Sequence, residues 1–90
     1  QWETTDLIKA AMGNQLSLCR ALLEAGHRVD DKDGDGSTAL WHAAARGHVM
    51  IAKFLIERGA KVNQWRLQDG LTPLMVAAQK NQLHMIVVRS

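Results

Sequence analysis

The hydrophobic residues of this chain fall into short clusters that polar turns separate. Residues 16–23 and 49–56 carry apolar side chains at positions i, i+3 and i+4, the spacing of one face of a helix. Glycine follows each cluster, as is typical of the end of a helix. Polar stretches over 31–36 and 64–70, each ending in glycine, come next and predict exposed turns. The pattern therefore predicts short helices joined by polar loops.

A short segment recurs three times along the chain. Thr, Leu and an Ala-Ala pair hold the same places in residues 5–11, 38–44 and 72–78. The threonines that begin these segments lie 33 and then 34 residues apart. A period of this length indicates a stacked array of supersecondary units, each contacting its neighbours, rather than a single globular core.

The residues around these segments predict where the first helix of each unit begins and ends. Each starting threonine can accept a hydrogen bond from a backbone N–H of the first turn. Pro73 follows the third threonine, at the first helical position, where its missing N–H costs nothing. Residue types that tolerate the left-handed conformation mark the predicted helix ends. The first helices end at Asn14, Gly47 and Asn81, and the second helices end at Gly26 and Gly59. Each unit is predicted to be a helix, a turn, a second helix and a polar loop.

This pattern resembles the ankyrin repeat. The middle unit matches best, with Gly-Ser-Thr-Ala-Leu at 36–40, Gly-His at 47–48 and Gly-Ala-Lys-Val-Asn at 59–63. The resemblance implies an all-α fold, an ankyrin-repeat solenoid of stacked helix-turn-helix units with protruding β-hairpin-like loops.

The resemblance also implies the organisation of the chain. A single domain or fragment would span residues 1–90. Repeat 1 would cover residues 3–35, repeat 2 residues 36–69, and repeat 3, incomplete, residues 70–90. Because the chain begins without methionine and the third unit stops inside its second helix, we expect it to be a part of a longer protein.

One signature position departs from the family. The histidine that usually follows Thr-Pro-Leu is replaced by Ile8, Trp41 and Met75. In the family this imidazole hydrogen-bonds toward the adjacent loop, so we expect the loops here to be less firmly held. We expect Trp41 to be half-buried packing rather than contact surface.

Composition and charge narrow the classes of function. Lys and Arg number 11 against 9 Asp and Glu, and they are spread along the 90 residues without a basic block, which weighs against nucleic-acid binding. No apolar run is long enough to insert into a membrane. The single cysteine, Cys19, excludes an internal disulfide framework and favours an intracellular location, cytoplasmic or nuclear.

No motif predicts catalysis, a cofactor or a metal site. Asp31, Asp33, Asp35 and Gly36 match the first half of an EF-hand loop, but the twelfth position is His42 instead of the bidentate glutamate. Turn chemistry explains the Asp and Gly content of this segment better than a calcium site does. The histidines lack the paired spacing of a zinc site, and Cys19 is expected on the apolar face of a helix. We therefore predict a non-enzyme.

The family resemblance places a partner surface on the loop tips and the late positions of each first helix, on the concave side of the stack. Trp and Arg are the residue types most enriched in interface hot spots, which makes Trp65 and Arg66 the expected anchors. The predicted function is a non-catalytic module that binds a protein or peptide with acidic and apolar side chains. The predicted binding residues are Trp2, Met12, Asp33, Asp35, Ser37, Arg46, Trp65, Arg66, Leu67, Gln68, Leu71, Gln79 and Lys80.

Two other functions stay open at this level. The same face could bind single-stranded RNA by stacking bases on Trp2 and Trp65, with low and salt-dependent affinity. The chain could instead be a structural spacer in a longer array. Separately, the family's Val-Asn element can be a substrate of an asparaginyl hydroxylase, which makes Asn63 a candidate for modification, with turn stabilisation as the alternative.

Overall fold

The computed structural model describes residues 6–34, 36–64 and 69–79, the side chains of Leu74 and Gln79 excepted. Within these ranges the chain is all-α and holds no strand. The helices are α1 (Asp6–Met12), α2 (Leu16–Glu24), α3 (Ala39–Arg46), α4 (Val49–Glu57) and α5 (Pro73–Gln79). This order confirms the predicted succession of helix, turn, helix and loop.

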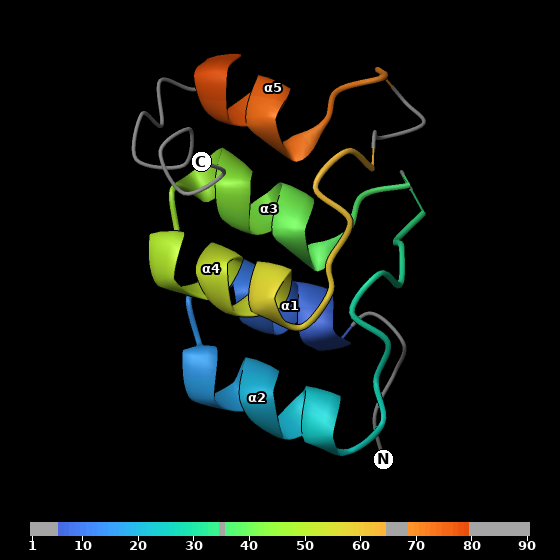
Figure 1. Cartoon of the computed structure of the whole chain (residues 1–90), viewed down its shortest axis with the longest axis vertical. Helices are drawn as coiled ribbons and strands as arrows, with labels where there is room; N and C mark the ends of the chain where they lie inside the picture. The colour runs from blue at the N-terminus through green and yellow to red at the C-terminus, as the bar shows by residue number, and fades with distance from the viewer. Residues whose placement is uncertain (1–5, 35, 65–68, 80–90) are drawn as a thin grey trace.

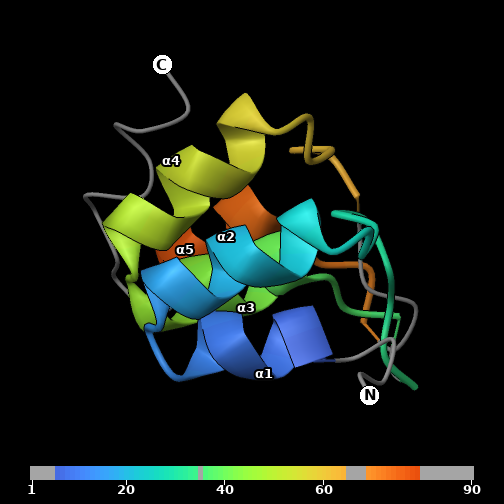
Figure 2. The same ribbon diagram turned by 90° about the horizontal axis from the view of Figure 1, so that it is seen from below.

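The helices form two layers. Helices α1, α3 and α5 pack side by side as one layer, with α3 between the other two (Figure 1). Helices α2 and α4 form the second layer, each packed against the first helix of its own unit (Figure 2). We call the surface of α1, α3 and α5 that faces away from α2 and α4 the inner face.

Local signals set the helix ends as the sequence predicts. The Thr38 hydroxyl accepts a hydrogen bond from the Trp41 backbone N–H at 3.2 Å, and the Thr72 hydroxyl does the same for Met75. Thr5 lies outside the described residues. Gly47 ends α3 with φ of 72°, and Asn14 follows α1 with φ of 58°, both in the left-handed region.

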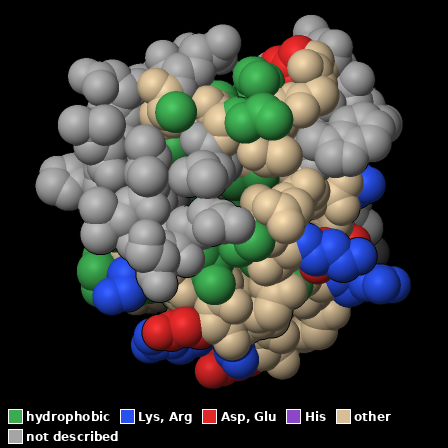
Figure 3. All heavy atoms as spheres, turned by 45° about the horizontal axis from the view of Figure 1, so that its top comes forward, with side chains coloured by type: hydrophobic (Ala, Val, Ile, Leu, Met, Phe, Trp, Pro, Cys, Tyr) green, Lys and Arg blue, Asp and Glu red, His purple; other side chains and the backbone are tan. Residues whose placement is uncertain are grey.

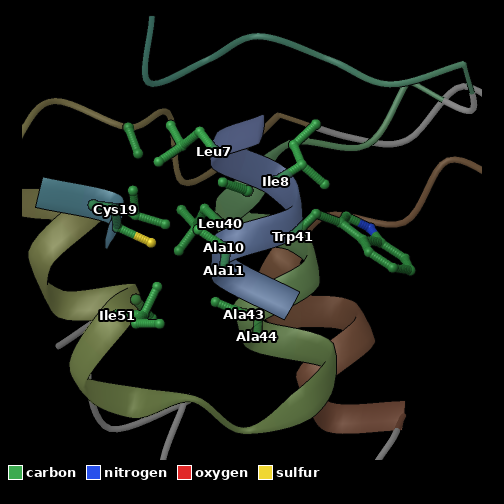
Figure 4. Packing of buried hydrophobic residues seen from close by; sticks show 14 of the residues in the cluster. Leu7, Ile8, Ala10, Ala11, Cys19, Leu40, Trp41, Ala43, Ala44 and Ile51 are labelled. Carbon is green, nitrogen blue, oxygen red and sulfur yellow. The ribbon is translucent and has the colours of Figure 1, made fainter. Parts of the chain in front are cut away.

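The core lies between the two layers. Leu22, Ile51 and Leu55 of the outer helices have no exposed surface. The two Ala-Ala pairs of α1 and α3 are buried to 1% exposure or less, so the inner helices approach closely (Figure 4). Small side chains at these places let three short helices share one continuous hydrophobic cluster.

The loop before α3 is a closed turn rather than a pair of strands. The backbone N–H of Asp33 donates to the carbonyl of Ser37 at 2.9 Å, and the backbone N–H of Gly36 donates to the backbone carbonyl of Asp33 at 3.0 Å. The carboxylate of Asp30 accepts from the backbone N–H of Lys61 at 3.0 Å and so ties this loop to the next one. The residue limits of the three repeats remain a prediction.

Candidate protein-interaction surface

The last residues of α1 and α3 are exposed. Met12, the last residue of α1, is 36% exposed, and Arg46, the last residue of α3, is also exposed. The imidazole Nε2 of His48 donates to the carbonyl of Met12 at 3.2 Å. This bond holds the C-terminal ends of α1 and α3 close together, so Met12 and Arg46 lie at the same end of two adjacent inner helices.

Asp33 connects the loop before α3 to α3 itself. One of its oxygens, Oδ1, accepts from the backbone N–H of Ser37 at 3.0 Å. The other, Oδ2, lies 3.0 Å from Nε2 of His42. The loop tip thus folds back on the helix that it precedes.

His42 continues this connection to Arg46. The Arg46 Nη1 atom lies 3.3 Å from Nδ1 of His42, one helical turn earlier. Arginine can only donate, so Nδ1 is the acceptor and the ring proton must be on Nε2. His42 therefore donates to the Asp33 carboxylate and accepts from Arg46. We call this chain of hydrogen bonds the Asp33–His42–Arg46 relay.

The relay was not predicted from the sequence. From the sequence, His42 stands out only as a possible metal ligand or as an EF-hand position. The spacing of His42 and Arg46, four residues apart on a helix, is the one local signal that could have indicated their contact. The contact with Asp33 depends on how the loop folds.

One of the predicted binding residues, Ser37, is buried. Its side chain is 1% exposed, and its hydroxyl oxygen has no hydrogen-bond partner among the described residues. The loop turns inward at this point because the Ser37 backbone N–H and carbonyl both bond to Asp33. Ser37 therefore cannot offer its side chain to a partner, and the prediction that it belongs to the exposed surface is wrong.

For the loop that precedes α5, Trp41 corrects the expectation that the loops are loosely held. Its side chain is 6% exposed, more deeply buried than the half-burial expected, and is packing rather than contact surface. The indole Nε1 donates to the carbonyl of Leu71 at 3.0 Å, so tryptophan replaces the family's histidine as the donor to the next loop. Met75, at the same place in the last described helix, is 48% exposed, and hydrophobic side chains appear on that end of the molecule (Figure 3).

Other predicted residues are placed only in part. Leu71 is half-buried and Asp33 is partly buried. The remaining predicted positions lie outside the described residues or have undescribed side chains, namely Trp2, Asp35, Trp65, Arg66, Leu67, Gln68, Gln79 and Lys80. Partner binding by these residues remains a prediction.

The outer layer carries a cluster that the sequence did not single out. The guanidinium groups of Arg20 and Arg58 lie 5.5 Å and 5.2 Å from the centre of the Phe54 ring. Such contacts are cation–π interactions, which hold both arginines over the ring. They join α2 to α4 from outside and thereby support the stacking of the two units.

The chemistry of the remaining candidates follows from their surroundings. Cys19 is fully buried, and this burial raises the pKa of its thiol to about 11, which disfavours the nucleophilic thiolate. Among the described residues no group of three His, Cys, Asp or Glu side chains is arranged to hold a metal ion. Asn63 is exposed, beside a surface hollow lined by residues 59–64.

Comparison with known proteins agrees with this geometry. A model of ankyrin repeats in three copies matches residues 7–88. The chain belongs to the ankyrin repeat family. Ankyrin repeats are non-catalytic and in general serve as protein-interaction modules. In this ankyrin domain no described helix is both long and apolar enough to cross a bilayer.

Several relatives of the ankyrin domain are palmitoyltransferases. It is 35% identical over 86 residues to palmitoyltransferase ZDHHC17 of Danio rerio and 34% identical over 86 residues to that of Homo sapiens. It is 31% identical over 83 residues to palmitoyltransferase ZDHHC13 of Homo sapiens. These matches cover 96%, 96% and 92% of the chain but only 14%, 14% and 13% of the relatives.

Proposed function

We propose that this chain is a protein-binding module whose inner face contacts a protein or peptide. The observation that carries the proposal is that exposed Met12 and exposed Arg46 end the adjacent helices α1 and α3 at the same end of the stack. An apolar and a cationic side chain at the same end of two adjacent helices suit a partner with apolar and acidic residues. The predicted anchors Trp65 and Arg66 would extend the surface along the following loop.

Site-specific photo-crosslinking tests this proposal. A photoreactive methionine analogue is placed at Met12 in one sample and at Met50 of α4 in another. Met50 is the matched control because it is 63% exposed but lies on the outer layer. We expect protein adducts from position 12 and few from position 50. Trp65→Ala combined with Arg66→Ala should reduce the yield from position 12.

Each other outcome contradicts the proposal in a different way. Adducts that form at position 50 and not at position 12 would place the binding surface on the outer helices. Recovery of RNA instead of protein would support the nucleic-acid alternative. The absence of any adduct would support the role of a structural spacer.

The similarity to palmitoyltransferases favours a more specific proposal. In this proposal the chain is a part of a palmitoyltransferase, and its repeats bind a protein for that enzyme. The binding would take place inside the cell, in cytoplasm or nucleus. Cells fed a labelled palmitate analogue provide the test. The protein crosslinked at Met12 should carry the label, and disruption of the gene that encodes this chain should remove it. An unlabelled partner would contradict this proposal and leave the binding function intact.

A further inference from the structure

The guanidinium group of Arg46 is held in place, but by no carboxylate of the part of the chain that the structure describes. Its Nη1 donates to Nδ1 of His42, and no carboxylate among the described residues pairs with it. Arginine carries five N–H donors in a planar fork. The relay uses one of these nitrogens, so the remaining donors of an exposed, permanently charged group are available to a ligand.

The nearby Asp33 carboxylate bonds to His42 rather than to Arg46, which leaves the charge of Arg46 available to an anionic ligand. Along the described parts of α1, α3 and α5 the charged residues are Asp6, Lys9 and Arg46. Asp6 begins α1, at the opposite end of the inner face, whereas Arg46 ends α3. The C-terminal end of a helix also favours a cation, which suits the place of Arg46 at the end of α3.

The Asp33–His42–Arg46 relay limits where Arg46 can point. Asp33 is fixed by its bond to the Ser37 backbone, and it fixes the ring of His42 with the proton on Nε2. Only this tautomer leaves Nδ1 free to accept from Arg46. The edge of the Trp41 ring, with its centroid 5.3 Å from that of His42, adds a further contact on the imidazole. A side chain restrained in this way loses less conformational entropy when a ligand binds.

We propose that Arg46 binds a carboxylate of an acidic segment in the partner protein and that Asp33 and His42 are positioning residues that orient it. The inference rests on the proposed function, because it names the chemistry that the inner face recognises. A glutamate or aspartate of the partner would accept two parallel hydrogen bonds from the guanidinium. Exposed Met12 would contact an apolar side chain of the same segment.

Two pools of displayed random peptides test the partner chemistry. One pool has glutamate at its centre and the other has glutamine, and both are selected on the complete chain. We expect binders from the glutamate pool to be enriched and to contain apolar residues near the centre. Arg46→Gln should weaken the best of these peptides by about tenfold or more, the range for a lost charge-assisted hydrogen bond. Lys53→Gln is the matched control, because it removes an exposed charge from α4.

A double-mutant cycle tests the relay. Asp33→Asn puts an amide N–H₂ opposite either Nε2 of His42 or the Ser37 N–H, and either placement breaks a bond of the relay. We expect Asp33→Asn to weaken the selected peptide by about threefold in the wild-type background and not at all in Arg46→Gln, since residues in one network are coupled. Nitrogen NMR of His42 should report the Nε2–H tautomer in the wild type and a loss of that preference in Asp33→Asn.

The outcomes separate this inference from the proposed function. Equal binding of the two pools, or unchanged binding by Arg46→Gln, would overturn the inference while the protein-binding function survives. Equal losses from Asp33→Asn in both backgrounds would show that Asp33 does not act through Arg46. Binding of neither pool would contradict the inference, and crosslinking at Met12 would then decide whether the proposed function stands without it.

Discussion

The indole N–H of Trp41 donates a hydrogen bond to the carbonyl of Leu71 across 3.0 Å. This bond joins α3 to the loop that leads into α5, thirty residues later in the chain. It is side chain to backbone, and the Trp41 ring that makes it is 6% exposed. The second and third units are therefore held together by a polar contact in addition to apolar packing.

Removal of this donor should destabilise the contact between the second and third units. We expect Trp41→Phe to lower the free energy of unfolding by about 1–3 kcal/mol, since it leaves the partly buried Leu71 carbonyl without its donor. Trp41→His is the matched variant, because it also shortens the side chain but keeps a ring N–H. Urea unfolding followed by circular dichroism should find Trp41→His the more stable of the two. Equal stability of the two variants would show that the hydrogen bond contributes little.

Ile51 and Met50 are neighbours in α4 with opposite environments. Ile51 has no exposed surface, whereas Met50 is 63% exposed. We expect Ile51→Val to cost about 0.5–1.5 kcal/mol, because a buried methyl group is lost and a small cavity remains. Met50→Leu should change stability by less than about 0.5 kcal/mol. A thermal unfolding series of both variants measures this, and equal effects would contradict the assigned faces of α4.

Gly59 and Gly34 are exposed glycines that differ in backbone conformation. A Cβ atom at either would meet no atom within 4 Å, but only Gly59 has a left-handed φ, of 93°. Because L-residues are strained there, we expect Gly59→Ala to cost about 1–2 kcal/mol. Gly34→Ala should be close to neutral. Chemical unfolding midpoints of the two variants measure this difference. A larger loss of stability from Gly34→Ala would contradict the assignment of backbone strain to Gly59.

The buried thiol of Cys19 should make stability depend on alkaline pH. Burial raises its pKa from the ordinary value of 9.0 to about 11 in the folded chain. Between these values the unfolded chain releases the proton and the folded chain retains it, so the free energy of unfolding falls as the pH rises. Below the unfolded value both states are protonated and this contribution is constant and fully present.

The pH effect can be isolated with Cys19→Ala. We expect the stability difference between wild type and variant to be constant below pH 9.0 and to shrink as the pH rises toward 11. Urea midpoints of both proteins, measured across this range, cancel the titration of lysines and other groups common to the two. A difference that stays constant over the whole range would contradict the raised pKa. Slow reaction of the native thiol with a disulfide reagent gives an independent check.

Features that depend on a few neighbouring residues were predictable. The Thr38 cap, the left-handed Gly47 and the Pro73 start all need only the residues of one helix turn. The period of the repeat then extends these local predictions to the whole stack. For this reason the all-α fold and its family could be inferred before any tertiary contact was known.

Features that depend on how a loop folds against a helix were not predictable. Ser37 reads as an exposed turn residue, yet its backbone bonds to Asp33 turn it inward. The contact of Asp33 with His42 joins residues nine apart, and no helical or strand spacing brings such a pair together. The link from Trp41 to Leu71 spans two units and required the stacking itself.

The sequence by itself determined the helices, their order and the stacked architecture, because helix caps, left-handed glycines and small alanine pairs act within one unit and recur at a fixed period. Only the tertiary structure decided which loop side chains are buried and how Arg46 is held. The physical reason is that the orientation of Arg46 depends on His42, and that of His42 on Asp33 from a separate loop. Hydrogen bonds of that kind exist only after the loop has packed against α3.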